Sequence, residues 1–313
     1  MVLEERPGGS LGSRLVPFLA RLFVYPLLAW TPFALMRFAA VIDLMAVVLR
    51  PPRGTRTARV RGLGCAAEWV RAKGVDHRSR RVILYFHGGG FVLCGLRTHR
   101  RLVARLSLAA GAPVLSVAYR KPPGVPFTET VEDCVAAYRW LLARGYAADD
   151  IVVAGDSAGG YLSFLTPLRA VAEGLPRPGG IVALSPFIDL DHAARLGTDP
   201  YLPVSRLPAL SHLLWPGIVP TDPLWGPAHA DLSVLPPVLI QAGSREVLRA
   251  DAELMAAALD RAGVPCRLQI WQGQVHAFQV FADLAREGVA AIAEAGAFVR
   301  AVGPDHGIRG ARA

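Results

Sequence analysis

The 313-residue sequence predicts an α/β fold built on a mostly parallel sheet. From about Arg59 onward, short β-branched runs alternate with longer stretches of helical periodicity, which is typical of βαβ units. The strand candidates are nearly continuous apolar runs, as expected for strands that are covered on both faces. Hydrophobic residues make up 52% of the chain and charged residues only 19%, so there is enough apolar material to cover such a sheet.

The predicted elements alternate regularly through the middle and C-terminal parts of the chain. Strands are expected over Arg81–Phe86, Pro113–Tyr119, Ile151–Ala154, Ile181–Leu184, Pro237–Gln241 and Arg267–Trp271. Apolar residues at helical spacing predict helices over Thr98–Ala110, Phe127–Gly145, the segment after Ser157, Val247–Gly263 and Ala282–Val302.

The alternation stops between Pro186 and Pro236, where the sequence becomes rich in proline and carries Tyr201, Trp215 and Trp225. This stretch is too long for an ordinary connection. Because long excursions in compact domains are usually lids or binding loops, it predicts a substrate-covering cap inserted at about 189–229. We therefore expect a catalytic domain over 56–303, preceded by an apolar helical segment, 1–55, and followed by a flexible tail, 304–313.

The segment from Leu15 to Leu49 is almost entirely apolar, yet it does not resemble a membrane span. Its longest uncharged run, between Arg21 and Arg37, is 15 residues and contains Pro26. A spanning helix needs about 20 apolar residues. Two interpretations remain open: a pair of helices that covers the active-site mouth, or an amphipathic segment that docks onto lipid.

Charge and cysteine content argue against several other classes of protein. The net charge is +9, but the 34 basic residues are scattered, so no nucleic-acid partner is expected. The four cysteines form no C-x-x-C pair, and no histidine spacing indicates a metal site, so neither a metal nor a cofactor is expected. Glu4 and Glu5 stand where a secretory signal would be basic. The expected location is the cytoplasm, with a peripheral position at the membrane as the alternative.

The strongest indication of function is a G-x-S-x-G turn, Gly155–Gly159, between a predicted strand and a predicted helix. Such a turn holds its serine in a strained backbone conformation that leaves room only for small neighbours. The serine oxygen then projects above the sheet, and free N–H groups at the start of the helix face developing negative charge. This placement predicts that Ser157 is a nucleophile rather than a capping residue.

A second glycine cluster, His87–Gly90 (HGGG), follows the strand predicted at Arg81–Phe86. Without side chains, successive backbone amides can converge on one point. An HGGG segment supplies one part of an oxyanion hole, and the amide after the nucleophile, here that of Ala158, supplies another. One such donor typically contributes about 2.7–4 kcal/mol of transition-state stabilisation. The alternative interpretation is that these glycines only make the connection between strand and helix flexible.

The catalytic base is expected near the C-terminus, because hydrolases with this nucleophile turn have the order serine, acid, histidine. His276 lies just past the last predicted strand, where a loop can hold it over the sheet edge. His306 lies in the polar tail and is expected to be solvated. His87 precedes the glycines and is expected to support the loop. His276 is therefore the predicted base.

The acid should follow the penultimate strand. Glu246 lies three residues past Gly243, and Asp251, about one helical turn further, is the alternative. An acidic residue here would also complement the dipole at a helix N-terminus. Glu246 is the predicted acid.

Several segments together resemble the hormone-sensitive lipase family of α/β-hydrolase esterases and lipases, from about Val82 to Phe278. The matching segments, in family order, are HGGGF (87–91), YR (119–120), PF-x-x-x-V-x-D (126–133), GDSAGG (155–160), SPFIDL (185–190), LPPVLIQAGSREVL (235–248) and HAF (276–278). Two segments depart from the family pattern. Lys121–Gly124 replaces the usual proline-glutamate, and Ala277 replaces the glycine of the family's HGF.

The resemblance implies an α/β-hydrolase fold with a helical cap made from the N-terminal segment and the central insertion. It implies that Ser157 is the nucleophile, His276 the base and Glu246 the acid, in a place usually held by aspartate. It also implies that the amides of Gly89, Gly90 and Ala158 form the oxyanion hole, with Gly88 as a weaker candidate.

These observations predict a serine carboxylesterase that hydrolyses short to medium acyl esters through an acyl-enzyme. The expected partner is a small-molecule ester, with possible peripheral membrane contact through residues 15–49. Alternatives are a membrane-associated lipase or amide deacetylase, and a non-catalytic receptor that keeps the hydrolase fold.

Overall fold

The computed structural model describes residues 1–30, 43–48, 50–189, 199–217, 219 and 221–303. Within these ranges, nine strands form one sheet in the order β1-β9-β8-β7-β6-β4-β5-β3-β2. Each pair of neighbours in the row β1-β9-β8-β7-β6-β4-β5 is parallel. At the other end of the sheet, β3 pairs antiparallel with β5, and β2 pairs antiparallel with β3. The fold is therefore α/β with a mostly parallel sheet, as predicted. The strands are β1 (Val2–Arg6), β2 (Arg56–Arg59), β3 (Ala66–Arg71), β4 (Val82–Phe86), β5 (Val114–Ala118), β6 (Ile151–Asp156), β7 (Gly180–Leu184), β8 (Val238–Gly243) and β9 (Cys266–Trp271).

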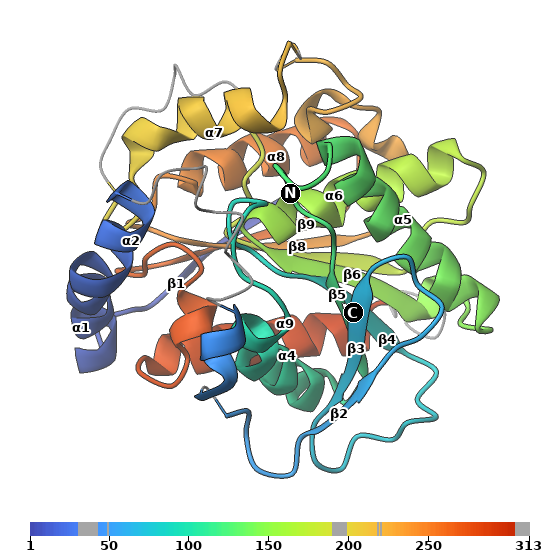
Figure 1. Ribbon diagram of the computed structural model, residues 1–313, viewed down its shortest axis with the longest axis horizontal. Coiled ribbons are helices and arrows are strands. Elements are labelled where there is room, and N and C mark those ends of the chain that lie inside the picture. The colour runs from blue at the N-terminus through green and yellow to red at the C-terminus, as the bar shows by residue number, and fades with distance from the viewer. Residues whose placement is uncertain (31–42, 49, 190–198, 218, 220, 304–313) are drawn as a thin grey trace, which may run out of the picture.

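Helices cover both faces of the sheet (Figure 1). On β4, Ile83 and Tyr85 pack in the core shared with α4 and α9, whereas Leu84 and Phe86 pack in the core shared with α5 and α6. Successive side chains of a strand point to opposite faces, so this alternation sorts the helices into two layers. The helices are α1 (Leu11–Leu19), α2 (Tyr25–Trp30), α4 (Leu96–Ala110), α5 (Phe127–Ala143), α6 (Ala158–Ala172), α7 (Leu207–Leu214), α8 (Arg249–Arg261) and α9 (Arg286–Ala301).

The N-terminal segment, predicted over 1–55 as an apolar helical segment, begins with a strand that the prediction did not include. Val2–Arg6 is a strand, β1, that pairs in parallel with β9 at the edge of the sheet. Its sequence, VLEER, carries three charged residues and is only partly covered, so it lacks the apolar run expected of a buried strand. The pairing is a tertiary contact with a strand more than 260 residues away in the chain.

After β1 the chain forms a continuous helical stretch, Leu11–Trp30, in which one turn of π-helix, Ala20–Val24, joins α1 to α2. It is long and apolar enough to cross a membrane when judged by length and composition alone. Figure 1 shows it at one side of the molecule, beside β1. Part of the predicted N-terminal segment, 31–42, and the predicted tail, 304–313, lie outside the described residues.

The described part of the central insertion includes α7, which runs above the carboxyl-terminal side of the sheet (Figure 1). Arg206, at the start of α7, donates to the carbonyl oxygens of Leu28 and Ala29 at the end of α2. The insertion and the N-terminal helices are thus held to each other.

Candidate active site

Four loops that follow parallel strands bring the predicted site residues to the same edge of the sheet. Gly88–Gly90 follow β4, Ser157 follows β6, Glu246 follows β8 and His276 follows β9. Parallel strands end at a common edge, so residues far apart in the chain meet there.

The turn between β6 and α6 holds Ser157 in a backbone conformation that few non-glycine residues adopt, with φ 53° and ψ −116°. Its amide donates to the Leu184 carbonyl over 2.8 Å. A Cβ on Gly155 would lie 2.2 Å from the carbonyl oxygen of Gly159, and a Cβ on Gly159 would lie 1.9 Å from that of Phe86. The two glycines are therefore required sterically, and the tight turn they permit exposes the serine oxygen.

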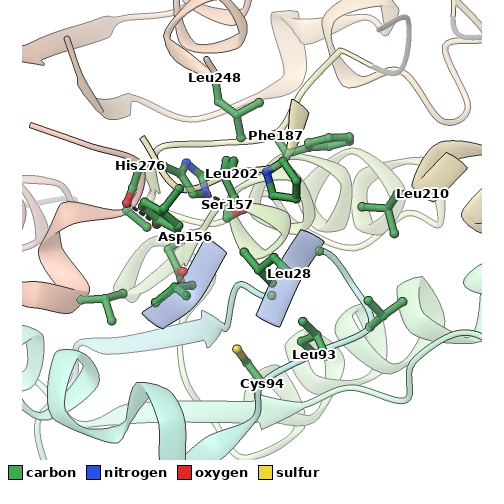
Figure 2. Close-up of a pocket in the computed structure, with 18 of the residues that line it drawn as sticks. Leu28, Leu93, Cys94, Asp156, Ser157, Phe187, Leu202, Leu210, Leu248 and His276 are labelled. Atoms are coloured by element: carbon green, nitrogen blue, oxygen red, sulfur yellow. Dashed lines mark hydrogen bonds between the residues drawn. The ribbon is translucent and has the colours of Figure 1, made fainter. Parts of the chain in front are cut away.

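Ser157, His276 and Glu246 form one chain of hydrogen bonds. The Oγ of Ser157 lies 2.9 Å from Nε2 of His276, and Nδ1 of His276 lies 3.1 Å from Oε2 of Glu246. The second carboxylate oxygen of Glu246, Oε1, accepts from the Gly243 amide over 3.0 Å. Figure 2 shows His276 beside Ser157 at the wall of a cavity. This is the geometry that a base-activated serine nucleophile requires.

The surroundings of His276 favour its protonated form. Burial by itself would lower the pKa of this imidazole, but the hydrogen bond and the charge of Glu246 outweigh it and raise the pKa above 6.5. The Tyr201 hydroxyl donates to the His276 carbonyl oxygen over 2.5 Å and so fixes the loop. An imidazolium formed during a reaction would be stabilised here.

The glycine loop after β4 lies beside Ser157. Gly89 and Gly90 have positive φ values, 113° and 60°, and both line the cavity into which Ser157 opens. Their amides donate to no acceptor within the described part of the chain. Together with the Ala158 amide at the first position of α6, they are available to an oxyanion.

Asp156, immediately before Ser157, is a buried carboxylate to which the sequence assigns no role. It accepts hydrogen bonds from the Tyr85 hydroxyl (2.6 Å), the Gly88 amide (2.9 Å) and His99 Nε2 (3.1 Å). Burial would raise its pKa, but the charge and hydrogen bond of His99 reverse the shift and lower it. Asp156 therefore ties the start of the glycine loop to the nucleophile turn.

The structure separates the remaining candidates from the reacting atoms. The predicted supporting histidine, His87, is fully buried, stacks on Tyr119 with ring centroids 4.4 Å apart, and bonds through Nδ1 to the Gly88 carbonyl. Burial lowers its pKa well below 6.5, so it is neutral. Asp251, the alternative acid, lies on α8 and accepts from the amides of Ile188 and Asp189, so it anchors the loop that follows β7. His306 lies outside the described residues.

Asp199 is a second buried carboxylate that sequence reasoning missed. Its Oδ1 accepts from the amides of Tyr201 and Leu202, and its Oδ2 accepts from the Val247 amide, next to Glu246. It therefore fastens the central insertion to the loop that carries the acid. No sequence pattern marks this role, because the bond that reaches the acid loop joins Asp199 to a main-chain amide 48 residues away.

The two departures from the family pattern lie close to the site. Ala277 adopts a left-handed conformation, φ 47° and ψ 39°, that glycine would adopt more readily, and its amide donates to Ser185 Oγ over 3.0 Å. Lys121 donates to the Cys94 carbonyl in the segment that follows the glycine loop. Both residues influence the conformation of loops near the site, and the hydrogen-bond chain from Ser157 through His276 to Glu246 is intact.

A cavity of about 360 Å³ opens onto Ser157 and His276. Its walls are mostly apolar and come from the N-terminal helices (Val24, Leu28), the glycine loop region (Leu93) and α7 (Leu207, Leu210). Figure 2 shows Leu28, Leu93 and Leu210 around it. Among the residues that the structure describes, no group of three His, Cys, Asp or Glu side chains could hold a metal ion.

Comparison with known proteins identifies the family of this chain. A family model described as alpha/beta hydrolase fold matches residues 83–280. An acetyl-hydrolase of Streptomyces hygroscopicus is 41% identical over 75% of this chain and 80% of its own length. Carboxylesterase/phospholipase LipF of Mycobacterium tuberculosis is 36% identical over 94% of this chain and 82% of its own.

A crystal structure of an esterase from the bacterial hormone-sensitive lipase family superposes with a TM-score of 0.84. The two chains are 36% identical, and the match covers 93% of this chain and 98% of that one. The chain thus belongs to the hormone-sensitive lipase family of α/β-hydrolases and is a carboxylic ester hydrolase.

Proposed function

We propose that this enzyme is a serine carboxylesterase that hydrolyses uncharged esters of short to medium acyl chains through a Ser157–His276–Glu246 triad. The observation that carries the proposal is the continuous hydrogen-bond chain from the serine oxygen through the imidazole to the carboxylate. It lies at the wall of an apolar cavity, so a hydrophobic acyl group can be bound beside the nucleophile.

Acylation begins when Nε2 of His276 takes the Ser157 proton and the serine oxygen attacks the ester carbonyl. Negative charge then develops on the carbonyl oxygen, where the amides of Gly89, Gly90 and Ala158 donate to it. The imidazolium of His276 next gives its proton to the leaving alcohol, and an acyl-serine remains.

Deacylation repeats these steps with water as the nucleophile. His276 takes a proton from the water as the water oxygen attacks the acyl carbon, and the tetrahedral intermediate forms in the same oxyanion hole. The bond to the serine oxygen then breaks, the imidazolium returns its proton to that oxygen, and the carboxylic acid is released. Glu246 accepts from Nδ1 throughout, which fixes the imidazole tautomer and stabilises the imidazolium without taking the proton itself.

The size of the cavity supports a preference for esters of short to medium acyl chains. At about 360 Å³ it lies near the lower end of ligand sites, which typically span about 300–1,000 Å³. Its apolar walls disfavour a charged acyl group. The N-terminal helices and the insertion at about 189–229 act as the cap, and the name acetyl-hydrolase of one relative agrees with short acyl groups.

The test is a profile of kcat/KM against p-nitrophenyl esters of graded acyl length, measured on the full chain. Activity should peak at short to medium chains and fall for long ones. Ser157→Ala should lower kcat by about 10⁶-fold and Glu246→Gln by about 10⁴-fold. Asp251→Asn is the matched control: it removes a buried carboxylate outside the triad, so kcat should be largely retained.

Two results would overturn the proposal. Absence of turnover at every chain length, together with a Ser157 that a fluorophosphonate probe fails to label, would indicate a non-catalytic receptor. A larger loss of kcat in Asp251→Asn than in Glu246→Gln would show that Glu246 is not the acid. Anilides of the same acyl groups, run in parallel, distinguish an esterase from an amide deacetylase.

A further inference from the structure

The helical stretch Leu11–Trp30 exposes several large apolar side chains on one face. Leu11, Leu15 and Phe18 recur at intervals of four and three residues and so lie on one face, and Leu22 and Phe23 follow one turn later. These five residues, here named the exposed apolar stripe, are all at least half exposed. A helix that only covers a core shows the opposite arrangement.

The opposite face of this helix packs tightly on the catalytic domain. Val16 and Ala20 are buried in a cluster with Trp271 and Phe278. Ser10 caps α1 and bonds to Glu287 of α9 through both its amide and its hydroxyl. The outward direction of the exposed apolar stripe is therefore set by the fold.

A hollow of about 880 Å³ beside the exposed apolar stripe is lined by three arginines, Arg14, Arg21 and Arg245. No ion pair within the described ranges involves any of them. The carboxylate of Asp199 also lines the hollow, but both its oxygens accept main-chain amides. The hollow is thus a basic site next to an apolar face.

From this arrangement we propose that α1 and α2 dock onto the surface of an anionic phospholipid membrane. The exposed apolar stripe enters the acyl boundary, and the three arginines bind headgroup phosphates in the adjoining hollow. Charge complementarity favours this occupant: between Glu5 and Asp43 the sequence has four arginines and no carboxylate. Trp30, which is 77% exposed, lies at the end of the helix, where an indole suits the membrane interface.

The helix lies on the membrane and does not span it. Its N-terminal end is joined to β1, which pairs within the sheet, and its C-terminal end is held by Arg206 of the insertion. Both ends are therefore attached to the same domain, whereas a spanning helix has its ends on opposite sides of the bilayer.

Docking would place the substrate cavity at the lipid surface. Val24 and Leu28, on the same helical stretch as the exposed apolar stripe, line the cavity that opens onto Ser157. An ester dissolved in the membrane would then reach the cavity without crossing bulk water. The docking itself does not depend on the proposed chemistry and is measured without it.

The experiment is flotation of the full chain with two kinds of vesicle, phosphatidylcholine alone and phosphatidylcholine mixed with phosphatidylglycerol. The protein should float with the mixed vesicles and much less with the neutral ones. The triple variant Arg14→Gln/Arg21→Gln/Arg245→Gln should lower partitioning into mixed vesicles roughly 100-fold. Leu15→Ser/Phe18→Ser should lower it roughly tenfold or more.

Matched controls carry the same changes elsewhere on the surface. Arg53→Gln/Arg56→Gln/Arg59→Gln removes three exposed arginines at or near β2, and Leu108→Ser removes an exposed leucine from α4. Both should float like the unaltered protein, and melting curves check that every variant is folded.

Partitioning that is indifferent to phosphatidylglycerol, or that falls equally in the control triple variant, would overturn the proposal. So would an absence of flotation combined with a dimer, seen by light scattering, that Leu15→Ser/Phe18→Ser dissociates. In that case a second copy of the chain, rather than lipid, covers the exposed apolar stripe.

Discussion

Buried carboxylates around the site are distinguished by what each one accepts. A charge is retained in a protein interior only where hydrogen bonds or opposite charges compensate for lost hydration. Asp199 and Asp251 accept main-chain amides and thereby fix loops. Glu246 accepts from the imidazole whose other nitrogen reaches Ser157, so its charge acts on the nucleophile. The group from which each buried carboxylate accepts a hydrogen bond, rather than its residue type, therefore decides whether it fixes a loop or acts on the nucleophile.

The pH dependence of hydrolysis should follow the protonation of His276. Only the neutral imidazole can accept the serine proton, so kcat/KM should fall as pH decreases through a pKa that lies above 6.5. Glu246→Gln removes the charge that raises this pKa and leaves the lowering effect of burial. Its acidic limb should therefore shift to lower pH, in addition to the loss of rate.

The measurement is kcat/KM for a soluble p-nitrophenyl ester from acidic to neutral pH. Glu253→Gln, which removes an exposed carboxylate paired with Arg249, is the control and should leave the profile in place. An acidic limb that moves upward, or stays fixed, in Glu246→Gln would contradict this account.

At the scale of elements, the site depends on how closely β4, β6 and α6 approach one another. The start of α6 contacts the end of β4 with no space for a side chain, since the Gly159 position faces the main chain of Phe86. Gly160 similarly faces Pro186, and a Cβ added to Gly160 would lie only 2.8 Å from the Pro186 Cα. These contacts hold the nucleophile turn at a set distance from the glycine loop.

Gly159→Ala should therefore destabilise the fold by more than about 4 kcal/mol, because main-chain atoms cannot move aside cheaply. Gly174→Ala is the comparison: this glycine has φ 79° but open space around it, so the cost should be about 1 kcal/mol. Denaturant unfolding of both variants measures the difference. Equal losses would show that backbone conformation, and not close packing, sets the requirement for glycine.

At the scale of the whole molecule, the substrate cavity is assembled from segments that are distant in the chain. The N-terminal helices contribute Val24 and Leu28, and the insertion contributes Leu207 and Leu210. Arg206 joins these two walls through the carbonyls of Leu28 and Ala29. The acyl-chain length that the enzyme prefers should therefore depend on the N-terminal segment as well as on the insertion.

Leu28→Trp should shift the preference toward shorter acyl chains, because the larger side chain occupies part of the cavity. We expect kcat/KM for an octanoyl ester to fall at least about tenfold relative to the acetyl ester. Leu108→Trp, an exposed change on α4, should leave the ratio unaltered. An equal loss for both esters in Leu28→Trp would mean that Leu28 supports the fold but does not limit chain length.

Much of the fold was predictable because its signals are local. Apolar runs marked β4 to β9, apart from boundaries that shift by a few residues, and helical periodicity marked α4, α5, α8 and α9. The edge strands β1 and β2, and β3 beside β2, escaped prediction because they carry polar residues and lack a continuous apolar run; all of β2 is exposed. Their strand conformation is imposed by neighbours in the sheet.

The sequence by itself determined the α/β class, the nucleophile turn and the order of the candidate residues, because glycine patterns and apolar periodicity act on neighbouring backbone. Only the tertiary structure decided which carboxylate meets His276, that Asp156 and Asp199 tie loops together, and that the helix Leu11–Trp30 turns its apolar stripe outward. Those outcomes depend on contacts between segments that are distant in the chain, and such contacts produce no local periodicity in the sequence from which they could be predicted.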